Sequence, residues 1–173
     1  MIELTGALKE RLDQAMRLSS AGVTEEQVLH FREVYKKAQI PLLSTAEAFY
    51  VKYGGVFKKG YIALADPRYN KEICFSFAAD YTNPKLSDPE RAAFSWLDDA
   101  MMDIDDVREF AKQEVCPVGE IGYYYPAEVF VGENGLLYCV YSYQDEIEVF
   151  SEPSEILESY LKYHEVVGYE EKC

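Results

Sequence analysis

The chain has 173 residues, of which 49% are hydrophobic, so it is long enough for one domain with a real core and too apolar for a disordered chain. No apolar run approaches the roughly 18 residues that a membrane helix needs, and the early charges of the Met1–Leu4 segment disfavour a signal peptide. We therefore expect a cytoplasmic protein with no membrane contact, folded as one domain over residues 1–173.

The charge of the chain is strongly negative and unevenly distributed. Thirty-one acidic residues oppose seventeen basic ones, a net of −14, and the part from Cys116 onward holds twelve acidic and two basic residues, a net of −10. Such a charge repels phosphate backbones, which disfavours direct nucleic-acid binding. It would attract a basic partner and speed their encounter, although an acidic exterior also keeps many proteins soluble without any partner.

The first part of the chain is predicted to form three helices. Apolar residues at helical spacing favour a first helix over residues 4–22. Thr24-Glu25-Glu26-Gln27 has the pattern of a capping box for a second helix, which Ile40-Pro41 ends. Ser44-Thr45-Ala46-Glu47 has the same pattern and predicts a short third helix that stops at Gly54-Gly55.

Strand and helix patterns alternate through the middle of the chain. Residues 56–57 and 61–65 favour a hairpin, and Glu72–Phe77 alternates cleanly between apolar and polar residues, as a strand does. Apolar positions spaced through Ile104–Ala111 then predict a further helix, with acidic residues in its first turn where the helix dipole favours them.

The last third of the chain predicts an antiparallel meander closed by a helix. A strand begins at Pro126, Asn134-Gly135 favours a type I′ turn, and strands follow at Leu136–Tyr143 and Glu146–Phe150. Pro153 suits the first turn of a final helix. The fold class predicted is therefore α+β, with N-terminal helices, a central and largely antiparallel sheet ending in a C-terminal meander, and a closing C-terminal helix.

Little in the sequence points to chemistry. Neither His30 nor His164 belongs to a metal motif, and a calcium loop counted from Asp103 would have Arg108 where a glycine is needed. The four cysteines form no Cys-x-x-Cys pair, which favours reduced structural thiols. A Cys–His pair assembled by the fold stays open, but we expect no catalytic residue, metal or cofactor.

Fifteen tyrosines need an explanation. Tyr123, Tyr124 and Tyr125 are consecutive, so a strand there would carry a phenol on each face. Tyrosine is enriched at interface centres, and tyrosines beside acids would make an aromatic and acidic binding face; equally, they could fill a thin core with their hydroxyls at its edge. The candidate partner contacts are Glu133, Tyr141, Tyr143, Asp145, Glu146 and Glu148.

Four groups of residues resemble motifs of the SUKH superfamily, and within it the third subgroup of bacterial immunity-protein domains. Ala21-Gly22-Val23 resembles its early Ala-Gly-Trp, and Phe49-x-x-x-Tyr53-Gly54-Gly55 its aromatic and Gly-Gly step from helix to strand. Cys116-Pro117-Val118-Gly119 resembles its entry to the sheet. The run from Phe130 to Tyr138, followed by Ser154-Glu155-Ile156-Leu157, resembles its hairpin and final helix.

The resemblance implies an α+β fold and a role in binding, with no catalytic residues to carry over. Members look like immunity proteins that neutralise polymorphic toxins, often nucleases. We therefore expect a non-enzymatic antitoxin that contacts a cognate toxin, one of basic character such as a nuclease. Two alternatives stay open: a regulatory scaffold of the same fold, as in fungal cell-wall regulators, and a small-molecule-binding domain or enzyme with a tyrosine-lined pocket.

Overall fold

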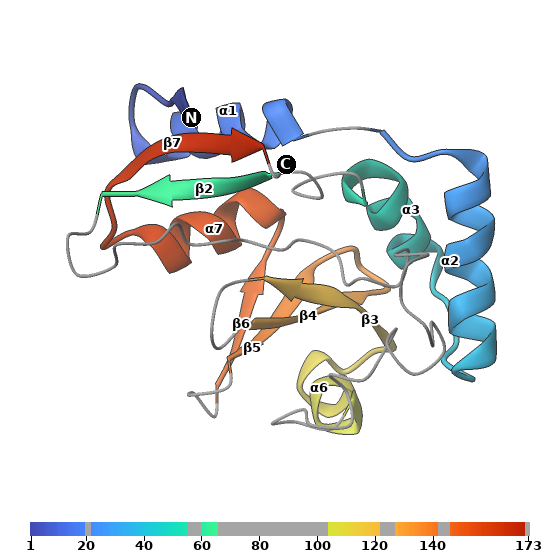
Figure 1. Ribbon diagram of the computed structural model, residues 1–173. Helices are drawn as coiled ribbons and strands as arrows, with labels where there is room; N and C mark the ends of the chain where they lie inside the picture. Colours follow the sequence, from blue (N-terminus) through green and yellow to red (C-terminus); the bar gives the residue numbers. More distant parts are fainter. Residues whose placement is uncertain (20–21, 55–59, 66–103, 122–126, 142–145, 172–173) are drawn as a thin grey trace.

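The computed structural model describes residues 1–19, 22–54, 60–65, 104–121, 127–141 and 146–171 (Figure 1). These ranges contain five helices and two antiparallel sheets, which confirms the predicted α+β class. The strand predicted at Glu72–Phe77 and the tyrosines of residues 123–125 lie outside them. The elements in chain order are β1 (Ile2–Glu3), α1 (Leu8–Ser19), α2 (Glu25–Lys37), α3 (Ser44–Tyr53), β2 (Gly60–Leu64), α6 (Ile104–Ala111), β3 (Val115–Ile121), β4 (Ala127–Gly132), β5 (Leu137–Tyr141), β6 (Ile147–Phe150), α7 (Pro153–Leu161) and β7 (Val166–Glu171).

The strands divide between two sheets. The predicted meander forms a four-stranded sheet in the order β3-β4-β5-β6, and a second sheet has the order β1-β7-β2. Neither β1 nor β7 was predicted, because each is defined by pairing between distant parts of the chain, such as Ile2 opposite Tyr169. The partner of β2 is β7, and the residues 56–57 expected to pair with β2 lie outside the described ranges.

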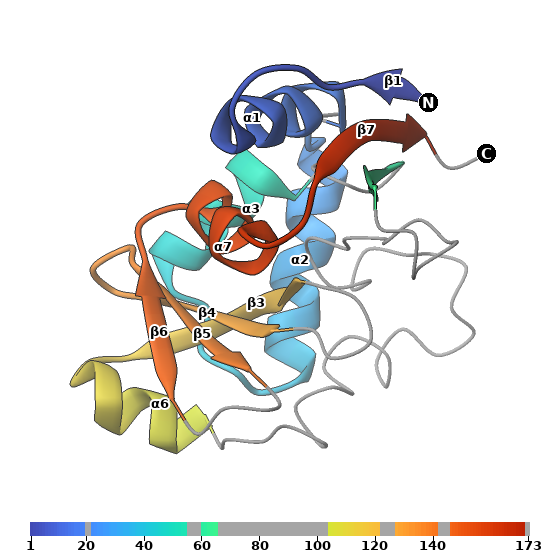
Figure 2. The same ribbon diagram turned by 90° about the vertical axis from the view of Figure 1, so that its left-hand side faces the viewer.

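Helix α7 lies between the two sheets. Figures 1 and 2 show it with α1 and β7 on one side and the four-stranded sheet on the other. Its residues Ile156, Leu157 and Leu161 are fully buried and join the same core cluster as Leu12 of α1. The Arg11 guanidinium of α1 also donates a hydrogen bond to the carbonyl oxygen of Val166, which fixes the start of β7. The C-terminal helix therefore closes the core, as predicted.

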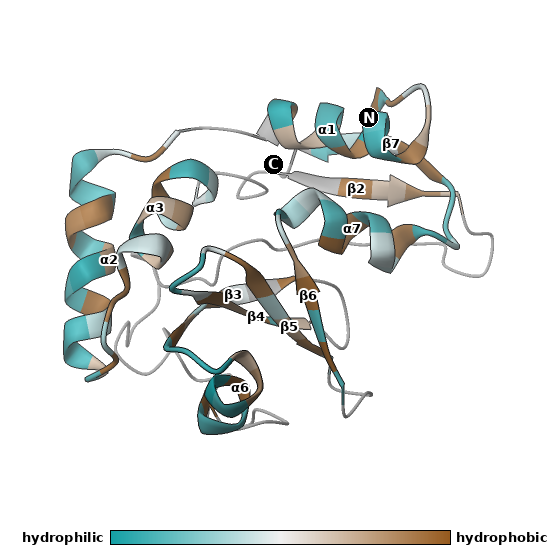
Figure 3. Cartoon of the chain, turned by 180° about the vertical axis from the view of Figure 1, so that it is seen from behind, coloured by the Kyte–Doolittle hydropathy of each residue, from teal (hydrophilic) through white to brown (hydrophobic). Residues whose placement is uncertain are grey.

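The four-stranded sheet is covered on both faces. Successive residues of β4 point to opposite sides, so that Val129 and Val131 join the main core with α2, α3 and α7, while Phe130 joins a smaller cluster with Val107 of α6. Figure 3 shows the matching hydropathy, with apolar strands and a largely polar outer surface on α6. The sheet is thus apolar on both sides, and few of its central residues can contact a partner.

The first helix is shorter than predicted. It begins at Leu8, because Gly6 has φ of +101° and breaks the helical path from Leu4. The Glu10 carboxylate accepts a 2.9 Å hydrogen bond from the backbone N–H of Ala7 and caps the first turn. None of the described helices combines the length and the apolar character needed to cross a membrane.

The two predicted capping boxes have different outcomes. At α2 the box is present, since the Thr24 side chain accepts from the Gln27 backbone and the Gln27 side chain from the Thr24 backbone. At α3 it is absent: the helix starts with Ser44 already inside it, and the N-cap residue is Leu43, which makes no side-chain cap hydrogen bond. The helix itself ends at Tyr53, followed by Gly54, as predicted.

The predicted type I′ turn between β4 and β5 does not form. Such a turn needs positive φ at both central residues, whereas only Gly135, at +78°, has it here. The carbonyl of Gly132 accepts from the Gly135 backbone, and the Gly132 backbone N–H donates to the Leu136 carbonyl at 3.0 Å. This is the longer hairpin loop in which a glycine makes a bulge. The Asn134 side chain stabilises it by accepting from the Leu136 backbone.

Candidate interaction surface

Two of the predicted contact residues meet on one face of the four-stranded sheet. Glu148 of β6 lies opposite Cys139 of β5, so both side chains point to the same face, and Tyr141, two residues further along β5, shares it. This is the face that α7 covers. Glu146 is exposed and immediately precedes β6. The end of the β5–β6 pair therefore combines a phenol with two carboxylates.

A pocket of about 350 Å³ opens at this place. Tyr141 and Glu148 line it from the sheet, and the end of α7 with the residues that follow lines the opposite side. Tyr141 is only 3% exposed, whereas the Tyr163 side chain is 87% exposed and Glu148 is half-buried. The residues contributed from α7 and beyond are Ser159, Tyr160, Lys162, Tyr163 and His164.

The Glu148 carboxylate contributes a negative charge to the lining of this pocket. Among the described residues, no hydrogen bond or ion pair joins it to another group, and Lys162 instead places its Nζ over the Tyr163 ring, 5.1 Å from the centroid. The charge of Glu148 also acts on the neighbouring Cys139 thiol. The pKa of this thiol is raised, mainly by burial and further by Glu148. The pocket wall therefore favours a cation.

Of the remaining predicted contacts, Glu133 does not join this group. Glu133 is exposed in the turn between β4 and β5, at the opposite end of β5 from Tyr141. The four residue steps of β5 alone separate those two ends by roughly 13 Å. Tyr143 and Asp145 lie outside the described residues. The four predicted contacts that the structure describes therefore fall in two separate regions: Tyr141, Glu146 and Glu148 at the pocket end of β5, and Glu133 at the other end.

Other late carboxylates have local structural roles. Glu155 accepts from the backbone and side chain of Ser151, which lowers its pKa, and Glu170 pairs with the N-terminal ammonium at 3.4 Å. Glu128 is only 7% exposed on the sheet. These three carboxylates are thus spread over different elements.

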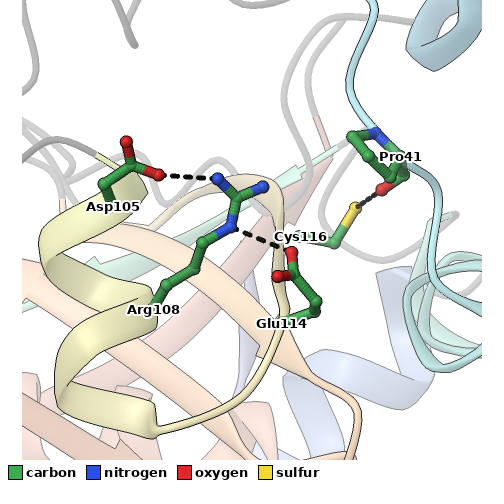
Figure 4. Close-up of polar contacts among 5 residues, drawn as sticks. All are labelled: Pro41, Asp105, Arg108, Glu114 and Cys116. Atoms are coloured by element: carbon green, nitrogen blue, oxygen red, sulfur yellow. Dashed lines mark hydrogen bonds and ion pairs between the residues drawn. The ribbon is translucent and has the colours of Figure 1, made fainter.

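No catalytic arrangement is seen among the described side chains. They contain no group of three or more His, Cys, Asp or Glu residues placed to hold a metal ion. The Cys116 thiol donates to the Pro41 carbonyl at 3.6 Å, and burial raises its pKa to about 11, so it is a poor nucleophile (Figure 4). Arg108 of α6 is the residue that stands where a calcium loop would need a glycine. It forms ion pairs with Asp105 at 2.7 Å and with Glu114 at 3.0 Å (Figure 4).

A second pocket lies beside the first turn of α7, which contributes Pro153 to its lining. It measures about 250 Å³, and Phe49 and Lys52 of α3 line it together with Leu137 of β5. Lys52 is already engaged there, since its Nζ lies 4.7 Å from the centre of the Tyr53 ring, and its pKa is raised by Tyr53 and by the charge of Glu152. This pocket is smaller than the roughly 300–1,000 Å³ typical of small-molecule sites.

Sequence reasoning missed the α7 half of the larger pocket. Tyr160, Tyr163 and His164 are not among the contacts predicted from the sequence. Tyr160 lies in the last turn of α7, whereas Tyr163 and His164 follow the helix, so no helical spacing relates the three residues. Only the packing of α7 against the sheet places them beside Glu148.

Comparison with protein-family models, curated proteins and solved structures found no match to this chain. The function of the chain must therefore be inferred from its charge, its larger pocket and its motif resemblance.

Proposed function

We propose that this chain is a non-catalytic immunity protein of the SUKH type, which acts in the cytoplasm and neutralises a basic polymorphic toxin by direct protein–protein contact. The observation that carries the proposal is the net charge of −14, with −10 from Cys116 onward, together with an aromatic pocket whose wall bears the carboxylate of Glu148, which forms no ion pair with a described residue. The motif resemblance supplies the class of partner.

The charge supports such a role physically. A protein with this excess of acidic groups attracts a basic partner over several ångströms and speeds their encounter, and the attraction weakens as salt screens it. A nuclease that binds phosphates carries a basic surface, so an acidic protein can occupy the position of its substrate. An inhibitor that blocks an active site by occlusion needs no reactive group of its own. The buried Cys116 thiol, whose pKa is raised, is a poor nucleophile and fits such a role.

The test is a binding and rescue experiment with the toxin encoded beside this chain. Co-expression should restore growth of cells that produce the toxin, and the two proteins should co-purify. The association rate should fall steeply as ionic strength rises, while the dissociation rate changes little. Absence of binding, or binding that leaves the toxin active, would reject the proposal.

The same experiment separates the alternatives. A regulatory scaffold of this fold would bind other proteins without relieving toxicity. A small-molecule-binding protein would be stabilised against thermal unfolding by a metabolite rather than by a basic protein.

A further inference from the structure

We propose that the pocket between β6 and the end of α7 is a receptor for one arginine side chain of the partner. This inference rests on the proposed function and deepens it, by assigning the contact chemistry to a defined place. The pocket brings Tyr141 and Glu148 from the sheet against Tyr160 and Tyr163 from the helix end, in a volume of about 350 Å³. No single stretch of sequence contains this arrangement.

The Glu148 carboxylate supplies the charge of the pocket. Glu148 is half-buried against the sheet, and water screens a half-buried carboxylate less than an exposed one. No ion pair with a described residue neutralises it, and Lys162, which also lines the pocket, lies over the Tyr163 ring instead. An anionic ligand would be repelled here, whereas a cation would gain a charge-assisted hydrogen bond.

The aromatic residues select the type of cation. The contact of Lys162 with Tyr163 shows that this ring already accepts a cation on its face, and Tyr163 is 87% exposed, so most of its surface stays available. A guanidinium is planar, stacks on phenol rings and binds a carboxylate with two parallel hydrogen bonds. An ammonium neither stacks flat on a ring nor forms two parallel hydrogen bonds with one carboxylate, so arginine fits the lining better than lysine.

Other occupants fit less well. A wholly apolar side chain would bury the Glu148 carboxylate without a partner, which is costly. A phosphate or a nucleic-acid backbone would face the same carboxylate and the surrounding negative charge of the chain. Ser159 and His164 add polar groups to the lining.

The probe is N-acetyl-arginine amide, titrated into the isotope-labelled protein and followed by backbone amide chemical shifts. We expect saturable shifts confined to the pocket residues, with a dissociation constant on the order of millimolar for so small a ligand. N-acetyl-citrulline amide, which has nearly the same shape without the charge, should cause no saturable shift. Equal shifts from both compounds, shifts centred elsewhere, or no shift with arginine would overturn the proposal.

Two substitutions locate the site. Glu148→Gln should weaken arginine binding about tenfold or more, because it removes a hydrogen bond between charged groups. Glu109→Gln removes the same charge from an exposed position of α6, which packs on the opposite face of the sheet, and should leave binding unchanged. Tyr163→Ala, at a largely exposed position, keeps the test valid if Glu148→Gln disturbs folding, and should also weaken binding.

The outcomes distinguish this inference from the proposed function. If arginine binds in the pocket but no neighbouring toxin is neutralised, the pocket assignment stands and the immunity function fails. If the toxin is neutralised equally well by the native chain and by Glu148→Gln, the immunity function stands and the pocket is not the contact. Loss of toxin binding in Glu148→Gln, with Glu109→Gln unaffected, supports both.

Discussion

The ring of Phe31 stacks on the ring of Tyr50, with 4.0 Å between centroids and 6° between planes. Phe31 comes from α2 and Tyr50 from α3, and both are almost fully buried. Phe31 also packs against Tyr35 in a tilted arrangement at 4.6 Å, and the Tyr35 hydroxyl donates to the carbonyl oxygen of Pro117 in β3. Three aromatic side chains therefore link two N-terminal helices to the edge of the four-stranded sheet.

Truncating the first of these rings should destabilise the whole protein. Phe31→Ala removes the stack and leaves a cavity, so the free energy of unfolding should fall by about 3–5 kcal/mol. Leu29→Ala is the matched control, because Leu29 lies on the same helix but is 58% exposed, and it should change stability by only about 0.5 kcal/mol. Urea unfolding measures both. Similar losses from the two substitutions would contradict the packing.

Thr24 and Ser44, both expected to cap helices, should differ in how far alanine lowers the free energy of unfolding. Thr24→Ala removes a side-chain acceptor from the Gln27 backbone and should cost about 1 kcal/mol, whereas Thr24→Ser should retain most of it. Ser44 lies inside α3 and caps nothing, so Ser44→Ala should leave stability unchanged or slightly raised, since alanine favours helix interiors. Equal losses at Thr24 and Ser44 would show that both caps form in solution.

The caps also show what local sequence can predict. Thr24 and Ser44 begin the same four-residue pattern, yet only Thr24 forms the box. Leu42 and Leu43 pack against the main core, so the start of α3 is fixed by burial of the residues before it rather than by the hydroxyl of Ser44. The positions of the described helices followed from apolar spacing, but their first residues depend on tertiary contacts that spacing does not contain.

The pocket illustrates the same limit. Tyr141 and Glu148 could be chosen from the sequence by their aromatic and acidic character, but only the register of β5 and β6 shows that they share a face. The missing half comes from Tyr160 and Tyr163, which reach that face only because α7 packs across the sheet. Likewise β7 exists through pairing with Ile2 and Tyr61, which are more than a hundred residues away in the chain. Such non-local pairing leaves little local pattern to detect.

The ion pair between α2 and α3 should make stability depend on pH in acid. Arg32 donates to both carboxylate oxygens of Glu47, at 2.7 and 2.5 Å, and this hydrogen bonding lowers the pKa of Glu47 against an opposing effect of burial. The carboxylate is therefore easier to ionise in the folded state than in the unfolded chain. The resulting stabilisation is fully present above the unfolded pKa of about 4.3 and is lost as pH falls through the lower folded value.

A double-mutant cycle with Arg32→Gln and Glu47→Gln isolates this pair. The coupling free energy from urea unfolding should be favourable at neutral pH and should vanish in acid as Glu47 becomes protonated. High salt should also reduce it, because the Arg32 side chain is half exposed. A coupling that stays constant from neutral to acidic pH would mean that the paired charges contribute nothing.

The buried thiols should resist alkylation until the protein unfolds. Burial raises the pKa of Cys116 from its ordinary value of 9.0 to about 11, so the thiolate fraction near neutral pH falls about a hundredfold, and iodoacetamide attacks the thiolate. Cys139 is also fully buried, and its thiol pKa is raised by burial and by Glu148. Peptide-resolved mass spectrometry after brief alkylation should find both unmodified in the native protein and both modified in denaturant.

The raised pKa of Cys116 should also make the stability of the protein fall at alkaline pH. Between the unfolded pKa of about 9 and the folded value of about 11, the unfolded chain releases the Cys116 proton while the native state keeps it, so stability falls as pH rises through this range. Cys116→Ala should flatten that part of the pH profile, even though the loss of packing lowers stability at every pH. If Cys116 is alkylated in the native protein as fast as in denaturant, its strand does not exclude solvent and the packing of β3 against α2 must be wrong.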